Sequence, residues 1–311
     1  MLLKELSTYK TGGTCDQLIQ PQSVQELADA MGQIHGKRTN YFLLGAGSNS
    51  LIMDDHWPGA VISFSHMDHI RIEQTRVFAE AGLDNSKFAT ACYERSLAGV
   101  GWMYYMPGQL GATVRMNARC YGGEISGVVD AVTAVTEKGE IKTYTGREVF
   151  LGYKETLFMT KPEIVAMVEF NLTKGDQQQI RQLMDSCRAD REAKHQFVYP
   201  SCGCVFKNNY DVGIPSGLLL EQANVRQFST GQVEVSPYHA NFVFNKGATA
   251  IQILDVTLQM REAVYQKYGV WLDYEMEVLG LIPDDLKKWF QEERPQEFKQ
   301  ADLALLRTTV D

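Results

Sequence analysis

The segment 199–210 reads YPSCGCVFKNNY and gathers several side chains that are able to do chemistry. Cys202 and Cys204 flank one glycine, and a lysine and two asparagines follow them. Such a pair could bind a metal, form a disulfide, pack as small residues in a tight turn, or present one thiol for acid–base chemistry. Zinc sites normally combine two pairs of cysteine or histidine ligands, whereas the remaining cysteines of this chain are scattered. We therefore expect no metal site, and the tight turn and the reactive thiol stay open.

A second candidate is LGAGSNS, which follows an apolar strand at 41–44. Glycines let backbone N–H groups approach a phosphate closely, because no Cβ intervenes. The segment lacks the Gly-Lys-Ser/Thr ending of a P-loop and the third glycine of the dinucleotide-binding fingerprint. A second glycine-rich stretch spans 107–123 and is long for a plain turn. Together the two segments predict a diphosphate ligand that is held from two sides.

The surrounding pattern predicts the elements that must position these side chains. Ser23 is a favourable N-cap, and apolar residues follow it at helical spacing. Similar periodicity predicts helices over 177–194 and 250–268, whereas strands are expected at 41–44, 60–64, 76–82, 128–136, 140–144, 163–172, 238–245, 270–280 and within 199–210. Strands mixed with helices, without a regular βαβ alternation, indicate an α+β fold with a boundary near residue 173.

The composition limits the classes of function. The 311 residues are 44% apolar and 22% charged, which is typical of a soluble globular protein. A net charge of −8 argues against non-specific nucleic-acid binding. No apolar run approaches the ~18 residues of a membrane span, and no signal peptide is evident at the N-terminus. Six cysteines without tight disulfide spacing suit a reducing compartment, so a cytoplasmic location is expected.

A series of short blocks runs in a fixed order over residues 8–280. They are YKTGG.CD, LGAGSNSLI, PGQLGA.VRMNA..YGGEI, GYK...F, YPSCGCVFKN, VSPYHANFVFN and YEMEVLG. Their order and spacing resemble the UDP-N-acetylenolpyruvylglucosamine reductases, which are flavoenzymes of peptidoglycan synthesis. The short link between Phe170 and the helix at 177–194 resembles the branch of that family without an inserted substrate-domain loop.

The resemblance implies a domain arrangement and a set of ligands. A two-lobed FAD-binding domain of the vanillyl-oxidase type is expected over 1–173, with the lobes split near 65. A smaller α+β substrate-binding domain would cover 174–280, and 281–311 would form a C-terminal tail. The implied ligands are bound FAD, NADPH as hydride donor and a UDP-sugar substrate, on a monomer. The residues that match the family's flavin-binding segments are Gly45, Ala46, Gly47, Ser48, Asn49, Gly108, Gly111 and Asn117.

The resemblance also implies the reaction, the reduction of an enolpyruvyl ether to a lactyl ether. Such a reaction needs a cation or donor for the charge that develops on the substrate carboxylate, and an acid for the neighbouring carbon. The family uses an arginine, a serine and a glutamate. In this chain Lys154 stands at the arginine, Cys204 at the serine and Glu275 at the glutamate. A thiol with an ordinary pKa of about 8.5 is mostly protonated at neutral pH, so Cys204 could serve as the acid.

Further positions match family residues of the substrate cleft, namely Tyr153, Lys207, Asn208, His239 and Asn241. The chain departs from the family at several positions. Arg119 and Cys120 replace small residues beside the flavin segment, Tyr274 and Asn209 replace prolines, and Lys154 lacks the planar fork of arginine. Arg119 could obstruct a ligand or supply a compensating cation. The alternative functions are a flavin- or UDP-sugar-binding paralogue with lost or altered chemistry, and a flavin oxidase with another substrate.

Overall fold

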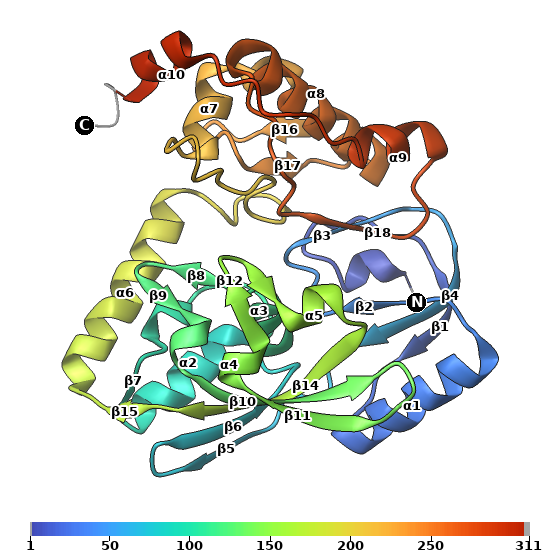
Figure 1. Ribbon diagram of the computed structural model, residues 1–311, viewed down its shortest axis with the longest axis vertical. Coiled ribbons are helices and arrows are strands. Elements are labelled where there is room, and N and C mark those ends of the chain that lie inside the picture. The colour runs from blue at the N-terminus through green and yellow to red at the C-terminus, as the bar shows by residue number, and fades with distance from the viewer. Residues whose placement is uncertain (1, 308–311) are drawn as a thin grey trace. The chain divides into compact units, whose positions relative to one another are not determined.

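Two separate groups of buried apolar side chains organise the protein. The computed structural model describes residues 2–307 (Figure 1). One compact unit, here called the sheet unit, contains residues 16–46 and 58–193. The other, here called the C-terminal unit, contains residues 194–307 together with residues 2–15 and 47–57. The compact units divide after Ala193, because the helix at 177–193 buries Cys187 in the core of the sheet unit.

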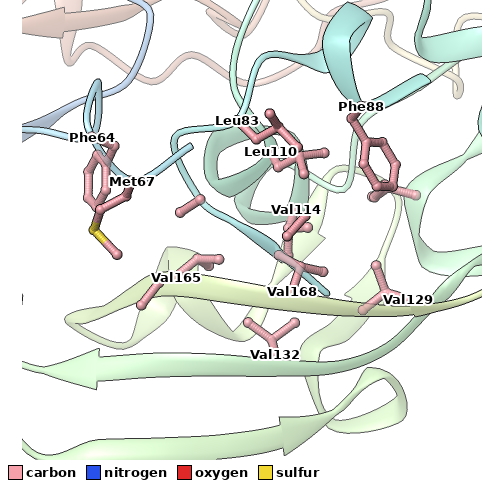
Figure 2. Close-up of a cluster of buried hydrophobic side chains, with 14 of the residues drawn as sticks. Phe64, Met67, Leu83, Phe88, Leu110, Val114, Val129, Val132, Val165 and Val168 are labelled. Atoms are coloured by element: carbon pink, nitrogen blue, oxygen red, sulfur yellow. The ribbon is translucent and has the colours of Figure 1, made fainter. Parts of the chain in front are cut away.

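The sheet unit is built on a five-stranded antiparallel sheet. Its order is β11 (Ile141–Thr145), β10 (Val129–Thr136), β14 (Glu163–Asn171), β6 (Arg76–Glu80) and β5 (Ile70–Glu73). Val132 pairs with Val168 in the register of β10 and β14, and both side chains are fully buried. Figure 2 shows these valines facing Leu110 and Val114 of α3 (Leu110–Arg115). The predicted strands and the hairpin of this unit are confirmed.

A smaller sheet and several short elements complete the sheet unit. Strand β2 (Tyr41–Leu44) runs parallel to β4 (Trp57–Ser63), and β1 (Cys15–Ile19) pairs with the other edge of β4. Ser23 accepts a hydrogen bond from Glu26 N and caps α1 (Val24–Lys37), as predicted. The remaining elements of the sheet unit are α2 (Asn85–Glu94), β7 (Leu97–Ala98), η2 (Gly101–Met103), η3 (Ile125–Gly127), α4 (Gly146–Val149), α5 (Leu157–Thr160), β15 (Thr173–Lys174) and α6 (Gln177–Ala193).

Two tight hairpins in this unit carry residues of interest. Strands β8 (Arg119–Cys120) and β9 (Gly123–Glu124) are joined by Tyr121 and Gly122, both of which have positive φ. This pair of left-handed residues is typical of the two-residue turns that match the twist of a hairpin. Strands β12 (Phe150–Gly152) and β13 (Glu155–Thr156) are likewise joined by two residues, Tyr153 and Lys154.

The C-terminal unit packs helices around short strand pairs. Strands β16 (Val233–Val235) and β17 (Val243–Asn245) are antiparallel, whereas β18 (Glu277–Leu279) runs parallel to β3 (Ser50–Ile52). Helix α8 (Ala250–Tyr268) confirms the predicted bounds, with a capping box at Thr249 and Gly269 at φ 66° after its end. The other elements of this unit are η1 (Leu3–Glu5), α7 (Ser216–Gln222), η4 (Val225–Phe228), α9 (Asp284–Phe290) and α10 (Gln300–Arg307).

Three strand predictions in the C-terminal unit need correction. No strand forms within 199–210. Of the strand expected at 238–245 only 243–245 forms, and of that expected at 270–280 only 277–279 forms. These segments instead pair through single bridges, Cys204 with Phe242 and Phe206 with Tyr274. A segment that changes partner after two residues cannot extend a ladder, although its side chains are as buried as those of a strand.

The C-terminal tail contributes to a core rather than standing apart from it. Leu303 and Leu306 of α10 are buried in the apolar cluster of the C-terminal unit. Within residues 2–307, none of the helices is both long and apolar enough to cross a bilayer.

Candidate active site

Cys204 and Glu275 are brought together by main-chain hydrogen bonds of the C-terminal unit. Val205 N donates to Asn241 O at 2.9 Å, and Glu275 N donates to Val205 O at 2.8 Å. The segment around Cys204 therefore lies between Asn241–Phe242 on one side and Tyr274–Met276 on the other. Both predicted catalytic side chains of this unit line the same cavity as a result.

This cavity has a volume of about 360 Å³. Its walls carry the predicted residues Cys204, Asn208, His239, Asn241 and Glu275. Lys207 does not belong to the wall; it is half-buried, and its N–H donates to Asp273 O at 2.9 Å. Glu221 of α7 also lines the cavity and was not predicted, because helical periodicity alone does not distinguish a cavity-facing carboxylate from a solvated one.

Two asparagines of the cavity wall bind the protein's own backbone. The buried Asn241 accepts from Phe206 N at 2.9 Å and donates to Phe206 O at 2.8 Å. Asn208 Oδ1 accepts from Ser216 N at 2.9 Å, which satisfies a donor at the start of α7. The side chain of Asn241 thus holds the chain two residues beyond Cys204, and that of Asn208 supports a helix.

His239 is positioned by apolar packing. Its ring stacks on Phe242 with centroids 4.5 Å apart, and a Cβ on Gly217 would lie 2.9 Å from its Cε1. Burial lowers the pKa of His239 below its ordinary value, and the nearby charge of Lys194 lowers it further. The imidazole is therefore neutral at pH 7, a form in which one nitrogen can accept a hydrogen bond and the other can donate one.

The second cysteine of the segment has a different environment. Cys202 is 5% exposed and lies in the apolar cluster of its unit. Burial raises its pKa far above the ordinary range, and the neighbouring Cys204 and Glu275 raise it further. All six cysteines are thiols, and residues 2–307 contain no group of three or more histidine, cysteine, aspartate or glutamate side chains placed to hold a metal. Cys202 is therefore a core side chain.

The glycine loop at 45–49 has two different parts. In the sheet unit, a Cβ on Gly45 would lie 3.3 Å from Gln109 Oε1. In the C-terminal unit, Gly47 has φ +63°, and a Cβ there would lie 2.6 Å from Leu6 O. Asn49 Nδ2 donates to Glu275 O at 2.8 Å. The loop residue Asn49 is thus tied to the backbone of the predicted catalytic glutamate, which block matching alone did not predict.

The second glycine-rich segment and the neighbouring Asn85 have buried polar atoms without a hydrogen-bond partner. These atoms are Asn85 Nδ2, Gln109 Oε1 and Asn117 Oδ1. Unpaired buried polar groups are rare in native proteins. Gln109 Oε1 faces Gly45, and Asn85 contacts the start of the same segment, because Asn85 N donates to Gly108 O at 3.1 Å. Such a set of open polar groups beside a glycine fits a large polar cofactor.

The other two predicted flavin-binding residues of this segment also have structural tasks. Gly111 N donates to Ala81 O at 2.8 Å, and a Cβ on Gly111 would lie 2.8 Å from Ala81 Cβ. Close packing against Ala81 is therefore one reason for a glycine at that position. Asn117 Nδ2 donates to Gly152 O at 2.8 Å and to Glu124 Oε1 at 2.9 Å. Asn117 thereby connects the two tight hairpins of the sheet unit.

Lys154 and Tyr153 lie at the turn of the β12–β13 hairpin. Lys154 has φ +49°, and its Nζ is 5.9 Å from the centre of the Tyr153 ring. The Arg119 guanidinium, from the β8–β9 hairpin, is 5.5 Å from the centre of the same ring. Two cations thus lie near one aromatic ring in the sheet unit.

Comparison with known proteins identifies two regions of the chain. Residues 15–145 match the family described as FAD binding domain, and residues 191–279 match the C-terminal domain of UDP-N-acetylenolpyruvoylglucosamine reductase. The reductase of Geobacillus thermodenitrificans is 34% identical over 279 residues, which cover 89% of this chain and 91% of the relative. The reductase of Latilactobacillus sakei is 35% identical with the same coverage.

The structural comparison agrees with these matches. The crystal structure of UDP-N-acetylenolpyruvylglucosamine reductase from Thermus caldophilus aligns with a TM-score of 0.74 and 26% identity, and covers 89% of this chain and 97% of that one. The α+β fold with an FAD-binding domain is thereby confirmed. The chain is 34% and 35% identical to these two relatives and covers 91% of the length of each. It therefore belongs to the UDP-N-acetylenolpyruvoylglucosamine reductase family.

Proposed function

We propose that this protein is an FAD-dependent reductase that uses NADPH to reduce UDP-N-acetylglucosamine enolpyruvate to UDP-N-acetylmuramate in peptidoglycan synthesis. The observation that carries the proposal is the cavity of the C-terminal unit, which Cys204 and Glu275 line together. These residues stand at the family's acid and glutamate positions, and family membership supports the substrate class.

The cofactor would be held by the glycine loop and the second glycine-rich segment. Gly45 lies beside Gln109 Oε1, and Gln109 and Asn117 offer buried polar atoms. When bound, the flavin supplies the hydride for the vinyl carbon. In the sheet unit, Ala46 and Gly108 are further proposed flavin contacts, and Gly111 N donates to Ala81 O. In the C-terminal unit, Ser48 and Asn49 are the proposed contacts, and Asn49 Nδ2 donates to Glu275 O.

The acid–base work falls to residues of this chain. Cys204 would donate the proton to the carbon next to the carboxylate, and Glu275 would act beside it in the same cavity. Lys154 would stabilise the negative charge that develops on the substrate carboxylate. Neutral His239 can donate or accept a hydrogen bond from the cavity wall, and Tyr153 and Lys207 complete the proposed substrate contacts.

Further expectations about the two units, the oligomeric state and the location belong to the same proposal. FAD binding is assigned mainly to the sheet unit, because residues 15–145 match the FAD binding domain. Substrate binding is assigned mainly to the C-terminal unit, because its match begins at residue 191. A monomer in the cytoplasm is expected, and the six cysteine thiols suit a reducing compartment.

An anaerobic half-reaction assay tests the function. The purified protein should carry flavin, and NADPH should bleach its visible absorbance. Addition of the enolpyruvyl UDP-sugar without oxygen should then restore the colour and yield the lactyl ether. Bleaching that only oxygen reverses would favour a flavin oxidase, and a flavin that NADPH does not bleach would favour a paralogue without reductase activity.

A further inference from the structure

The two tight hairpins of the sheet unit place a second cation beside the proposed charge-stabilising lysine. Arg119 is the first residue of β8, and Lys154 lies in the turn between β12 and β13. The Arg119 guanidinium is 5.5 Å, and the Lys154 ammonium 5.9 Å, from the centre of the Tyr153 ring. An aromatic ring attracts cations to its face, so Tyr153 holds both side chains in one neighbourhood.

The hairpins are fixed relative to each other by a hydrogen bond between them. Asn117, which precedes β8, donates from Nδ2 to Gly152 O at 2.8 Å at the end of β12. The next residue, Cys120, lies close enough to Lys154 to be affected by its charge. Burial raises the pKa of Cys120 to about 11, whereas the charges of Arg191 and Lys154 act to lower it. The positive charge of Lys154 thus acts on Cys120, which lies in the same strand as Arg119.

Arg119 is only weakly neutralised by the carboxylate opposite it. Its Nε is 4.0 Å from Glu124 Oε2, with the two side chains 47% and 35% exposed. An ion pair this long and this exposed contributes little. The other oxygen of Glu124 already accepts from Asn117 Nδ2 and from Ser126 Oγ, both at 2.9 Å. An incoming carboxylate can therefore compete with Glu124 for the guanidinium.

We propose that Arg119 and Lys154 form a two-cation site for the carboxylate of the enolpyruvyl group, and this inference rests on the proposed function. Lys154 supplies a point charge but no planar fork, and Arg119 supplies a guanidinium that can bind both carboxylate oxygens. The arginine at 119 compensates for the lysine at 154. Arg119 is a substrate-binding residue in this assignment, and Asn117 and Tyr153 are positioning residues.

The test compares Arg119→Ala, Arg119→Gln and the control Arg147→Ala, whose exposed side chain lies on α4 of the same unit. Calorimetry measures the Kd of the enolpyruvyl UDP-sugar and of the same UDP-sugar without the enolpyruvyl group. Loss of a charge-assisted hydrogen bond should raise the first Kd by about tenfold or more. The Kd of the UDP-sugar without the enolpyruvyl group should stay unchanged. In Arg147→Ala the Kd values of both UDP-sugars should stay unchanged.

The same comparison in a Lys154→Arg background tests the compensation. Because the arginine at 154 can itself bind both carboxylate oxygens, Arg119→Ala should change log Kd in that background by less than half as much as it does in the wild type. Unchanged binding in Arg119→Ala, tighter binding, equal loss for both UDP-sugars, or equal loss in both backgrounds would each overturn the two-cation site. If the wild type binds no enolpyruvyl UDP-sugar, the proposed function itself fails and this inference fails with it.

Discussion

At the scale of single residues, two cysteines separated by one glycine have different surroundings. Cys202 is buried in an apolar cluster, whereas Cys204 lines a cavity with Glu275. A proton donor must reach the reacting carbon, so only the side chain on the cavity wall can act. The resemblance to the reductase family leads us to expect an arginine at the position of Lys154 and a serine at that of Cys204.

The Cys204 assignment predicts a defect in one half-reaction. Cys204→Ala should leave the bleaching of flavin by NADPH intact and slow product formation by about 10²–10⁴-fold, the usual contribution of a general acid. Cys204→Ser should retain activity, because the hydroxyl can also donate a proton. Single-turnover kinetics with the reduced enzyme measure this step.

Cys202→Ala is the matched control for the same segment. The substitution removes one sulfur from the core, so a small loss of stability is expected and the rate should stay near that of the wild type. Full activity in Cys204→Ala would contradict the proton-donor role, and so would equal losses in Cys202→Ala and Cys204→Ala.

At the scale of elements, the segment 204–206 depends on neighbours distant in sequence. Asn241 forms two hydrogen bonds with the main chain of Phe206, and Phe206 is itself bridged to Tyr274. The hydrogen bonds of that bridge use the N–H groups of Lys207 and Glu275. The main-chain N–H of Tyr274 therefore takes no part in this bridge.

Asn241→Ala should destabilise the protein by about 2–4 kcal/mol, because a buried N–H and a buried C=O would lose their partners. The substitution should also reduce product formation, since the main chain beside Cys204 would shift. The control is Asn209→Ala, because the side chain of Asn209 accepts only an exposed turn hydrogen bond from Asp211 N. Urea unfolding of both variants measures the difference, and equal stabilities would refute the role of Asn241.

The glycine loop predicts a loss of cofactor without a loss of fold. Gly45→Val should lower the flavin-to-protein ratio, since a branched side chain would occupy the space facing Gln109. Gly47 is less suitable for this test, because its φ of +63° and its proximity to Leu6 O make any side chain strained.

Gly36→Ala in α1, where a Cβ would meet nothing within 4 Å, is the control and should keep full flavin. Unfolding temperature and absorbance are measured together for both variants. A Gly45→Val protein that folds and retains all of its flavin would remove this loop from the cofactor site.

At the scale of the whole molecule, the half-buried His239 links stability to pH. The pKa of His239 is lowered in the folded protein, mainly by burial. The unfolded chain therefore binds this proton at a higher pH than the folded chain does. The stability that neutral His239 provides is complete above its unfolded pKa of about 6.5. It is lost as pH falls from there through the lowered folded value.

His239→Phe should flatten this pH dependence and preserve ring stacking on Phe242. The contribution of one such group cannot exceed about 1.4 kcal/mol per pH unit. Urea unfolding of wild type and variant between pH 5 and pH 7.5, compared with the Asn209→Ala protein, measures the slope. An identical slope in all three proteins would assign the pH dependence to other groups.

Much of this molecule was predictable from local sequence signals. Ser23 and Thr249 cap helices whose apolar residues recur at helical spacing, and the burial of β6 alternates along the strand. Local hydrogen bonds and periodic burial decide such elements, so the sequence alone determined them. The order of short blocks also determined the family and the candidates Cys204, Glu275 and Lys154.

Only the tertiary structure decided how distant segments share hydrogen bonds. Two early segments, 2–15 and 47–57, belong to the C-terminal unit. The first is joined to it because the Tyr9 hydroxyl donates to Val243 O at 2.8 Å, and the second because Leu51 and Met53 are buried in its core. Extended segments such as 204–206 look like strands in sequence, since burial imposes the same apolar pattern. Whether they form a ladder or single bridges depends on which main-chain groups face them, and those groups come from residues far away in the chain.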